Sequence, residues 1–111
     1  MTKERTEIHE GSGNVFADIG LPDAEELLLK SRLVIELRRL IAARDLTQSA
    51  AAERLGITQP ELSHLLRGRL RGISVERLLR MLTAFEQDID IVLRPHDKAG
   101  EPGRITFSAT A

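Results

Sequence analysis

The chain has 111 residues, enough for one domain with a modest core and short tails. It contains no cysteine, so neither a disulfide framework nor a thiolate metal site can form. No apolar run approaches the roughly 18 residues of a membrane span, and the N-terminus is too charged for a signal peptide. We therefore expect a cytoplasmic protein that makes no membrane contact.

The formal net charge of −1 hides a segregation along the sequence. Residues 1–37 carry four basic and eight acidic side chains, and residues 81–111 carry three basic and five acidic ones. Residues 38–80 instead carry nine arginines against four acids, a net +5. Such a block is suited to attract a phosphate backbone, and arginine can bind phosphates or bases in a bidentate way. The alternative is an ordinary solvated charged surface.

Composition divides the chain into three parts. Residues 1–13 are polar, end in Gly-Ser-Gly and are expected to form a flexible tail. Residues 14–87 should form the folded domain, with its core in 33–86, and residues 14–22 are apolar enough to lie on it as an arm or helical turn. Residues 88–111 are a C-terminal extension that we expect to be β, and a dimer could form either through it or through the fourth helix.

A helix is expected to begin at Asp23, which forms a capping-box pattern with Glu26. Apolar residues then recur at spacings of three, four or seven up to about Arg44: Leu27, Val34, Leu37, Leu40 and Ile41. The pattern fits one long helix or two helices with a break near Ser31.

Residues 47–68 have the spacing of a helix-turn-helix unit. Thr47 should cap a helix that runs to Leu55, and Gly56 should end it in a left-handed conformation. A second capping box, Thr58 with Glu61, should start the next helix. The small Ala52 would allow these two helices to cross closely. Such a unit places its second helix in the major groove of DNA.

A loop rich in arginine, bracketed by Gly68 and Gly72, follows that unit, and Ser74 should cap a fourth helix. The apolar face of this helix is formed by Val75, Leu78, Leu79, Leu82 and Phe85. After Gln87 the apolar period changes from 3.6 to 2, in DIDIVLR and again in RITFSA, which predicts a strand or hairpin. A lone hairpin is marginally stable in water, so these strands should pack on the helices or pair with a second copy.

The candidate binding residues follow from these elements. We expect the helix that starts after Thr58 to present its outward side chains to base edges, and helix starts and arginines to hold the phosphates. The base-contacting set is Gln59, Pro60, Ser63 and His64, and the phosphate-contacting set is Gln48, Thr58, Arg67, Arg69 and Arg71. For each of them the alternative is an ordinary solvated side chain.

An enzyme is not expected. His9, His64 and His96 are scattered, without a second ligand at metal spacing, and no glycine-rich phosphate loop appears. Ser63 and His64 are adjacent on a helix and do not face each other as a catalytic pair would. We therefore expect no catalytic residue, no cofactor and no metal.

The segment LTQSAAAERLGITQPELSHLLRGR, residues 46–69, closely resembles the core of the Xre family of lambda-repressor-like and Cro-like helix-turn-helix regulators. The resemblance covers residues 38–85 and implies that Gln48 binds phosphate, and that Gln59, Pro60 and His64 lie where family members contact bases. The upstream segment GNVFADIGLPDAEELLLKSRL and the ending DIDIVLRP resemble the HigA-like antitoxins, which are often encoded beside RNase-type toxins. Family members usually dimerise and bind inverted repeats.

We therefore predict a mainly α, lambda-repressor-like bundle of four or five helices with a short C-terminal β-strand or hairpin. The predicted function is a homodimeric, sequence-specific regulator, a repressor that binds an inverted-repeat operator in double-stranded DNA. The alternative is an antitoxin that neutralises a small RNase-type toxin by direct binding, supported by the acidic residues 1–37.

Overall fold

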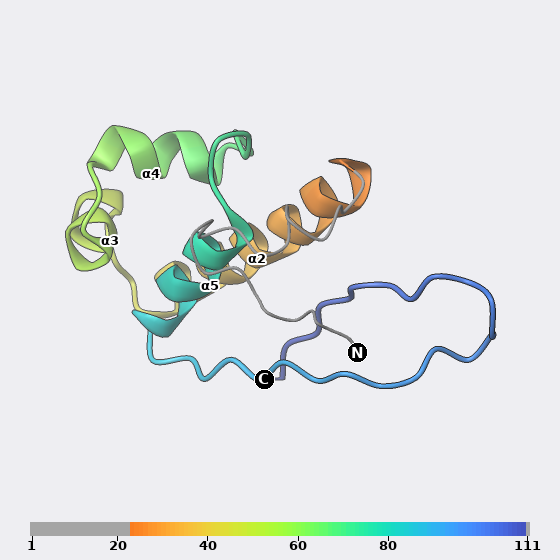
Figure 1. The fold of residues 1–111 in the computed structure, drawn as a ribbon. Helices are drawn as coiled ribbons and strands as arrows, with labels where there is room; N and C mark the ends of the chain where they lie inside the picture. Colours follow the sequence, from red (N-terminus) through yellow and green to blue (C-terminus); the bar gives the residue numbers. More distant parts are fainter. Residues whose placement is uncertain (1–22, 111) are drawn as a thin grey trace.

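The computed structural model describes residues 23–110, which contain four α-helices (Figure 1). They are α2 (Asp23–Ala43), α3 (Gln48–Leu55), α4 (Gln59–Leu66) and α5 (Val75–Thr83). The expected tail, residues 1–13, and the expected arm, residues 14–22, lie outside the described residues. None of the helices in the described part is long and apolar enough to cross a membrane.

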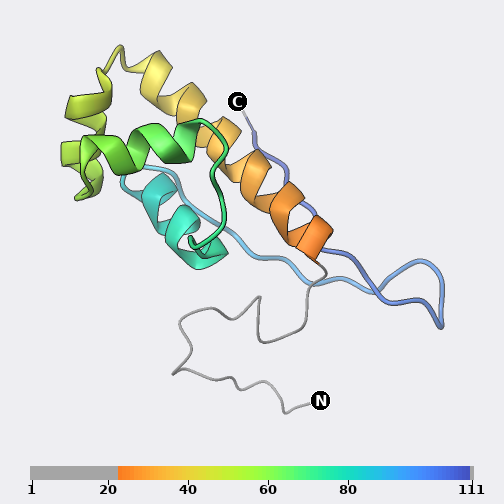
Figure 2. The same cartoon turned by 90° about the horizontal axis from the view of Figure 1, so that it is seen from above.

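The first described helix, α2, runs without a break through Ser31, which resolves the choice between one helix and two. Its buried side follows the predicted apolar stripe, and α5 packs alongside it (Figure 2). The helix α4 contacts both α2 and α3. The buried core is therefore built by all four helices: Leu33, Leu37, Ala51, Ala52, Leu62, Leu65, Val75, Leu78, Leu82 and Phe85 are among its members.

The helix-turn-helix unit has the predicted caps. The Thr47 side chain accepts a hydrogen bond from the backbone N–H of Ala50, at 3.1 Å. Gly56 ends α3 with φ +73°, in the left-handed region that favours glycine. Thr58 and Glu61 form the reciprocal capping box at the start of α4. These local contacts set the turn between α3 and α4.

Phe85, just after α5, is completely buried, and two arginine side chains lie over its ring. The guanidinium carbons of Arg44 and Arg54 are 5.2 and 4.9 Å from its ring centroid. Both arginines also bind the carboxylate of Glu86, at 2.7 and 2.9 Å, and donate to backbone carbonyls at the end of α5. Cations are favoured near helix C-termini and over aromatic faces, so this cluster joins the ends of α2, α3 and α5.

The expected C-terminal strand or hairpin is absent from residues 88–110. The segment leaves α5 as a first arm, residues 88–95, turns in an open loop, and returns as a second arm, residues 104–110 (Figures 1 and 2). Within the described part of the chain, residues 88–110 make one backbone–backbone hydrogen bond. It runs from the Glu101 N–H to the Lys98 carbonyl, at 3.4 Å. An alternating pattern alone does not create a strand, because a strand needs a neighbour to accept its hydrogen bonds.

Candidate nucleic-acid interface

The outer face of α4 carries most of the predicted base-contacting residues. Gln59, Pro60 and His64 are exposed on this short helix, as predicted. Ser63 is instead buried, with 9% of its surface exposed, so the prediction that it faces outward is wrong. Ser63 lies next to Leu62 and one turn from Leu66 on the side of α4 that packs on the core. The available recognition face is therefore narrower than the sequence suggests.

Gln48 and Gln59 are brought together by the fold, although eleven residues separate them. The amide nitrogen Nε2 of Gln59 donates to Oε1 of Gln48 at 2.8 Å. Gln48 is the first residue of α3 and Gln59 the first residue of α4, and both are exposed. The bond fixes one end of the Gln59 side chain and leaves its own oxygen available as an acceptor. It thus joins a predicted base-contacting residue to a predicted phosphate-contacting one.

Thr58 is used by the cap of α4. Its backbone N–H and its hydroxyl both donate to the Glu61 carboxylate, at 2.8 and 3.1 Å. These hydrogen bonds, with the nearby charge of Arg77, lower the pKa of Glu61 below its ordinary value of 4.5. A threonine hydroxyl has one proton to donate, so this arrangement leaves Thr58 no side-chain donor for a phosphate.

The arginines of residues 38–80 divide into two groups. Five of them bind groups of the protein itself: Arg38 donates to the Leu66 carbonyl, Arg39 pairs with Glu36, Arg44 and Arg54 pair with Glu86, and Arg80 pairs with Glu76. The other four, Arg67, Arg69, Arg71 and Arg77, are exposed and have no ion pair within 4.0 Å among residues 23–110. The positive charge that is free of ion pairs in residues 38–80 therefore lies around the end of α4 and the start of α5.

The loop between α4 and α5 holds two of these arginines in place. Leu70 is buried in the core, with 6% of its surface exposed, while Arg69 and Arg71 on either side are exposed. The buried Lys30 of α2 lies 3.5 Å from the Leu70 carbonyl and 3.1 Å from the Glu26 carboxylate. This anchor keeps the arginine-rich loop against the domain. Arg69 and Arg71 line an open groove together with His64 of α4 and Arg77 of α5.

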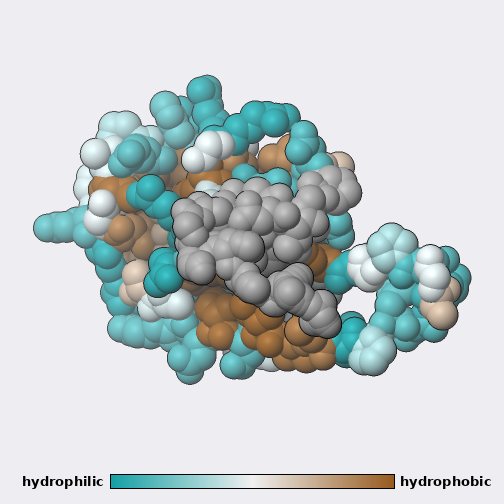
Figure 3. Space-filling view, viewed as in Figure 1, coloured by the Kyte–Doolittle hydropathy of each residue, from teal (hydrophilic) through white to brown (hydrophobic). Residues whose placement is uncertain are grey.

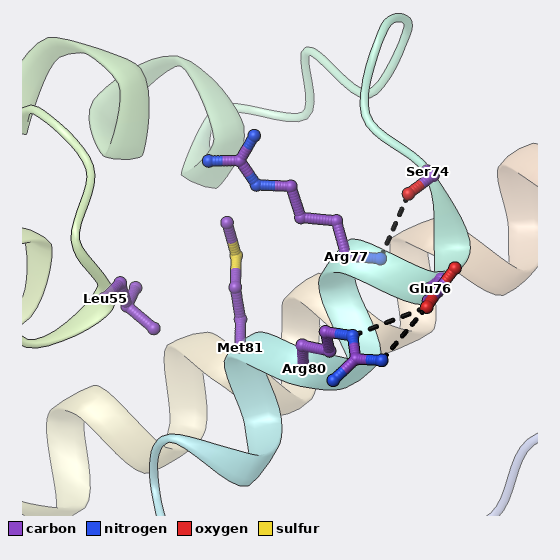
Figure 4. A pocket seen from close by; sticks show the side chains of 6 residues that line it. All are labelled: Leu55, Ser74, Glu76, Arg77, Arg80 and Met81. Atoms are coloured by element: carbon purple, nitrogen blue, oxygen red, sulfur yellow. Dashed lines mark hydrogen bonds and ion pairs between the residues drawn. The ribbon is translucent and has the colours of Figure 1, made fainter. Parts of the chain in front are cut away.

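Sequence reasoning did not single out Arg77. It lies in the first turn of α5, and its side chain extends from that helix toward α4 (Figure 4). The neighbouring Arg80 instead binds Glu76, at 3.2 Å, as Figure 4 also shows. The sequence does distinguish these two arginines, because Glu76 precedes Arg80 by four residues whereas no acid lies three or four residues before Arg77. The contrast depends on which of them has an acid one turn earlier.

The described residues contain no group of three or more histidine, cysteine or acidic side chains close enough to hold a metal ion. His96 lies 3.4 Å from Glu101 in the C-terminal loop, far along the chain from His64 of α4. The arrangement that the structure does present is an exposed helix face with four arginines beside it. That arrangement can bind a polyanion through hydrogen bonds and charge.

Comparison with known proteins agrees with this geometry. A family model described as "Helix-turn-helix domain" matches residues 15–94. A solved structure named as an XRE family transcriptional regulator is 45% identical to this chain, with a TM-score of 0.74. The match covers 80% of this chain and 100% of the other. No curated protein matches the sequence.

Proposed function

The chain belongs to the helix-turn-helix domain family and is an XRE-like DNA-binding regulator, and on that premise we propose that α4 is its recognition helix. In this proposal α4 enters the major groove with its N-terminal half toward the bases. Gln59 contacts a base edge there and Pro60 contributes an apolar contact, while His64 contacts a base edge from the last turn of the same helix. The observation that carries the proposal is the exposed Gln59 amide held by Gln48, with four exposed arginines nearby.

Phosphate binding is proposed for Gln48, Arg67, Arg69 and Arg71, and Arg77 joins this set. Gln48 is at the N-terminus of α3, where backbone N–H groups and the helix dipole favour an anion. The arginines lie beyond the other end of α4, so the two groups would hold the DNA backbone on both sides of the helix. Ser63 is not proposed as a base contact because it is buried.

We further propose that the protein acts as a homodimer on an inverted repeat and represses transcription there. Two copies related by a two-fold axis would place their α4 helices about 34 Å apart, on successive major grooves. A repressor of this kind acts by occupying its operator, and the described residues offer the binding face for that task.

Selection of binding sites from random duplex DNA, at two salt concentrations, tests the proposal. Gln59→Ala should blur one position of the selected motif, at a cost of about 1–3 kcal/mol there. Gln48→Ala should weaken binding to all sequences alike, because phosphate contacts carry no sequence information. Selection that yields no preferred sequence would refute sequence-specific recognition.

The salt dependence of binding tests the phosphate contacts separately. Arg69→Ala should reduce the slope of log K against log salt concentration by about one unit. Arg39→Ala is the matched control, since it removes the same charge from an arginine that is paired with Glu36 on α2. Equal slopes for the two variants would contradict the assignment of Arg69.

A second candidate function is the capture of a basic protein, such as a small RNase-type toxin. Its support is the exposed Asp23 at the start of α2 and the exposed apolar residues Leu28 and Ile35 on the same helix, whereas the neighbouring Glu26 is paired with Lys30. Leu28→Asp with Ile35→Asp should then abolish binding of the product of an adjacent gene while DNA binding persists. The absence of any adjacent gene for a small basic protein would contradict this candidate.

A further inference from the structure

We propose that the first arm, residues 88–95, pairs as an antiparallel strand with the first arm of a second copy, with the two-fold axis at Ile91. This inference rests on the homodimer proposed above, and it names the segment and the register that form it. The argument uses the backbone, the exposed apolar side chains and the charges of this arm.

The backbone of the first arm has no partner among the described residues. No backbone–backbone hydrogen bond there involves a residue from 88 to 95. An extended segment with unpaired N–H and C=O groups is a template for another strand. The second arm does not fill this role, because the two arms diverge in Figure 2.

The first arm also exposes large apolar side chains to water, which is unfavourable unless they pack on another surface. Ile91, Val92 and Leu93 are 75%, 73% and 94% exposed, and all three are consecutive. Figure 3 shows apolar atoms gathered along the lower edge of the molecule, where this arm passes below the helices. Burial of such a patch is favourable in proportion to the area removed from water. We therefore expect these side chains to pack against an apolar surface of a binding partner.

The charges of the arm identify that partner as a second copy in antiparallel orientation. With the two-fold axis at Ile91, each residue lies opposite the one whose number brings the sum to 182. Asp88 therefore faces Arg94 of the partner subunit, and by symmetry this ion pair occurs at each end of the paired strands. Asp90 faces Val92, and Ile91 meets its own symmetry mate. Opposite charges across a strand pair stabilise it, whereas like charges directly opposite destabilise it. In parallel orientation each aspartate and each arginine would face its own copy, so the antiparallel pairing is favoured.

The same register gives the apolar side chains a place to pack. Ile89 is partly buried and packs against the helical core of its own copy. Leu93, which is almost fully exposed, would lie opposite Ile89 of the partner subunit and so at the edge of the partner's core. Ile89, Ile91 and Leu93 share one face of the strand, and Val92 lies on the other face with the charged residues Asp88, Asp90 and Arg94. Pairing thus buries the most exposed apolar residue of the arm without burying a charge.

Single cysteines placed in this chain, which has none, test the register directly. On the two-fold axis the Cα atoms of two Ile91→Cys residues would be about 4.5–5.5 Å apart, within the range that a disulfide spans. Two Val92→Cys residues would be diagonal neighbours at about 7–8 Å, and Ala99→Cys in the open loop is the control. Under mild oxidation with a glutathione buffer, Ile91→Cys should form a covalent dimer about tenfold faster than either other variant. Equal rates, or faster crosslinking of Val92→Cys, would overturn the register.

Charge reversal tests the same pairing without a covalent bond. Arg94→Asp should raise the dissociation constant of the dimer about tenfold, measured by sedimentation, since it places like charges opposite each other twice. The double variant Asp88→Arg with Arg94→Asp restores the complementarity and should restore the dimer. The helical circular dichroism signal should be unchanged in both, because these side chains are exposed outside the helices. Failure of the double variant to recover would overturn the proposed ion pairs.

The two proposals fail in distinguishable ways. A dimer that persists in Arg94→Asp, with the motif from binding-site selection intact, would overturn the arm pairing and leave the DNA-binding role standing. A dimer that behaves as expected, but selects no DNA sequence, would overturn the DNA-binding role and support the arm pairing.

Discussion

The helical domain, residues 23–87, and the C-terminal extension, residues 88–110, use similar apolar residues with different results. In the helices each backbone N–H beyond the first turn finds its acceptor one turn away and the caps satisfy part of the first turn, so the apolar stripe only has to find a surface to pack on. In the extension the hydrogen-bond partner must come from another segment, and the described residues supply none for the first arm. The comparison teaches that an alternating apolar pattern makes a segment suited to be a strand but does not provide the neighbouring strand that must accept its backbone hydrogen bonds. We expect the domain to be stable by itself and the first arm to gain its order from a second chain.

The largest contrast between the two regions should come from deleting one apolar side chain in each. Phe85→Ala removes a fully buried ring, over which Arg44 and Arg54 lie, and should lower the free energy of unfolding by about 3–5 kcal/mol. Leu93→Ala, at dilution where the chain is monomeric, should change it by less than about 0.5 kcal/mol. Urea denaturation followed by circular dichroism measures both. A comparable loss for Leu93→Ala would show that the first arm belongs to the folded unit of the monomer.

The next contrast compares two glycines with the same backbone requirement. Gly56, with φ +73°, ends α3, and Gly100, with φ +88°, lies in the open loop of the extension. A Cβ would meet nothing within 4 Å at either position, so the cost of alanine is the left-handed backbone alone. Gly56→Ala should destabilise the domain by about 1–2 kcal/mol. Gly100→Ala should have little effect on the same unfolding transition, and an equal effect would contradict the separation of the two regions.

The cap of α4 should contribute less than the core but should affect recognition. Thr58→Ala removes the hydroxyl that accepts from the Glu61 N–H at 3.2 Å, and should cost about 1 kcal/mol of stability. Because α4 has eight residues, loss of its cap should also weaken DNA binding by fraying the turn that holds Gln59. Thermal unfolding and a binding titration measure the two effects. Thr110→Ala, in the second arm, is the control that should change neither.

The smallest expected effect is a pH dependence from Glu61. Hydrogen bonds from Thr58 lower the pKa of Glu61 in the folded chain below its ordinary value of 4.5. The charged carboxylate therefore stabilises the fold above that value, and this contribution is lost as the pH falls through the lowered pKa. Glu61→Gln should flatten the dependence of stability on pH below about 4.5. An unchanged dependence of stability on pH in Glu61→Gln would refute the role of Glu61.

The sequence by itself determined the helix-turn-helix unit, because its signals are local. Capping residues at Thr47, Thr58 and Ser74 act within three residues, and the left-handed turn at Gly56 depends on one residue. The apolar spacing also predicted the helices and most of the core, since a helix positions its faces by period alone. The exposed Gln59, Pro60 and His64 follow from the same period.

Only the tertiary structure decided the features that depend on distant partners. The burial of Ser63 depends on which residues of the other helices pack against α4. The pairing of Arg44 and Arg54 with Glu86 joins residues more than thirty positions apart in the sequence. Arg38, Arg44 and Arg54 also bind distant groups, which only the fold brings near, whereas Arg39 and Arg80 bind acids one turn away on their own helices. The missing C-terminal strand has the same cause, because backbone hydrogen bonds between strands are contacts at a distance, which the sequence of one segment cannot supply.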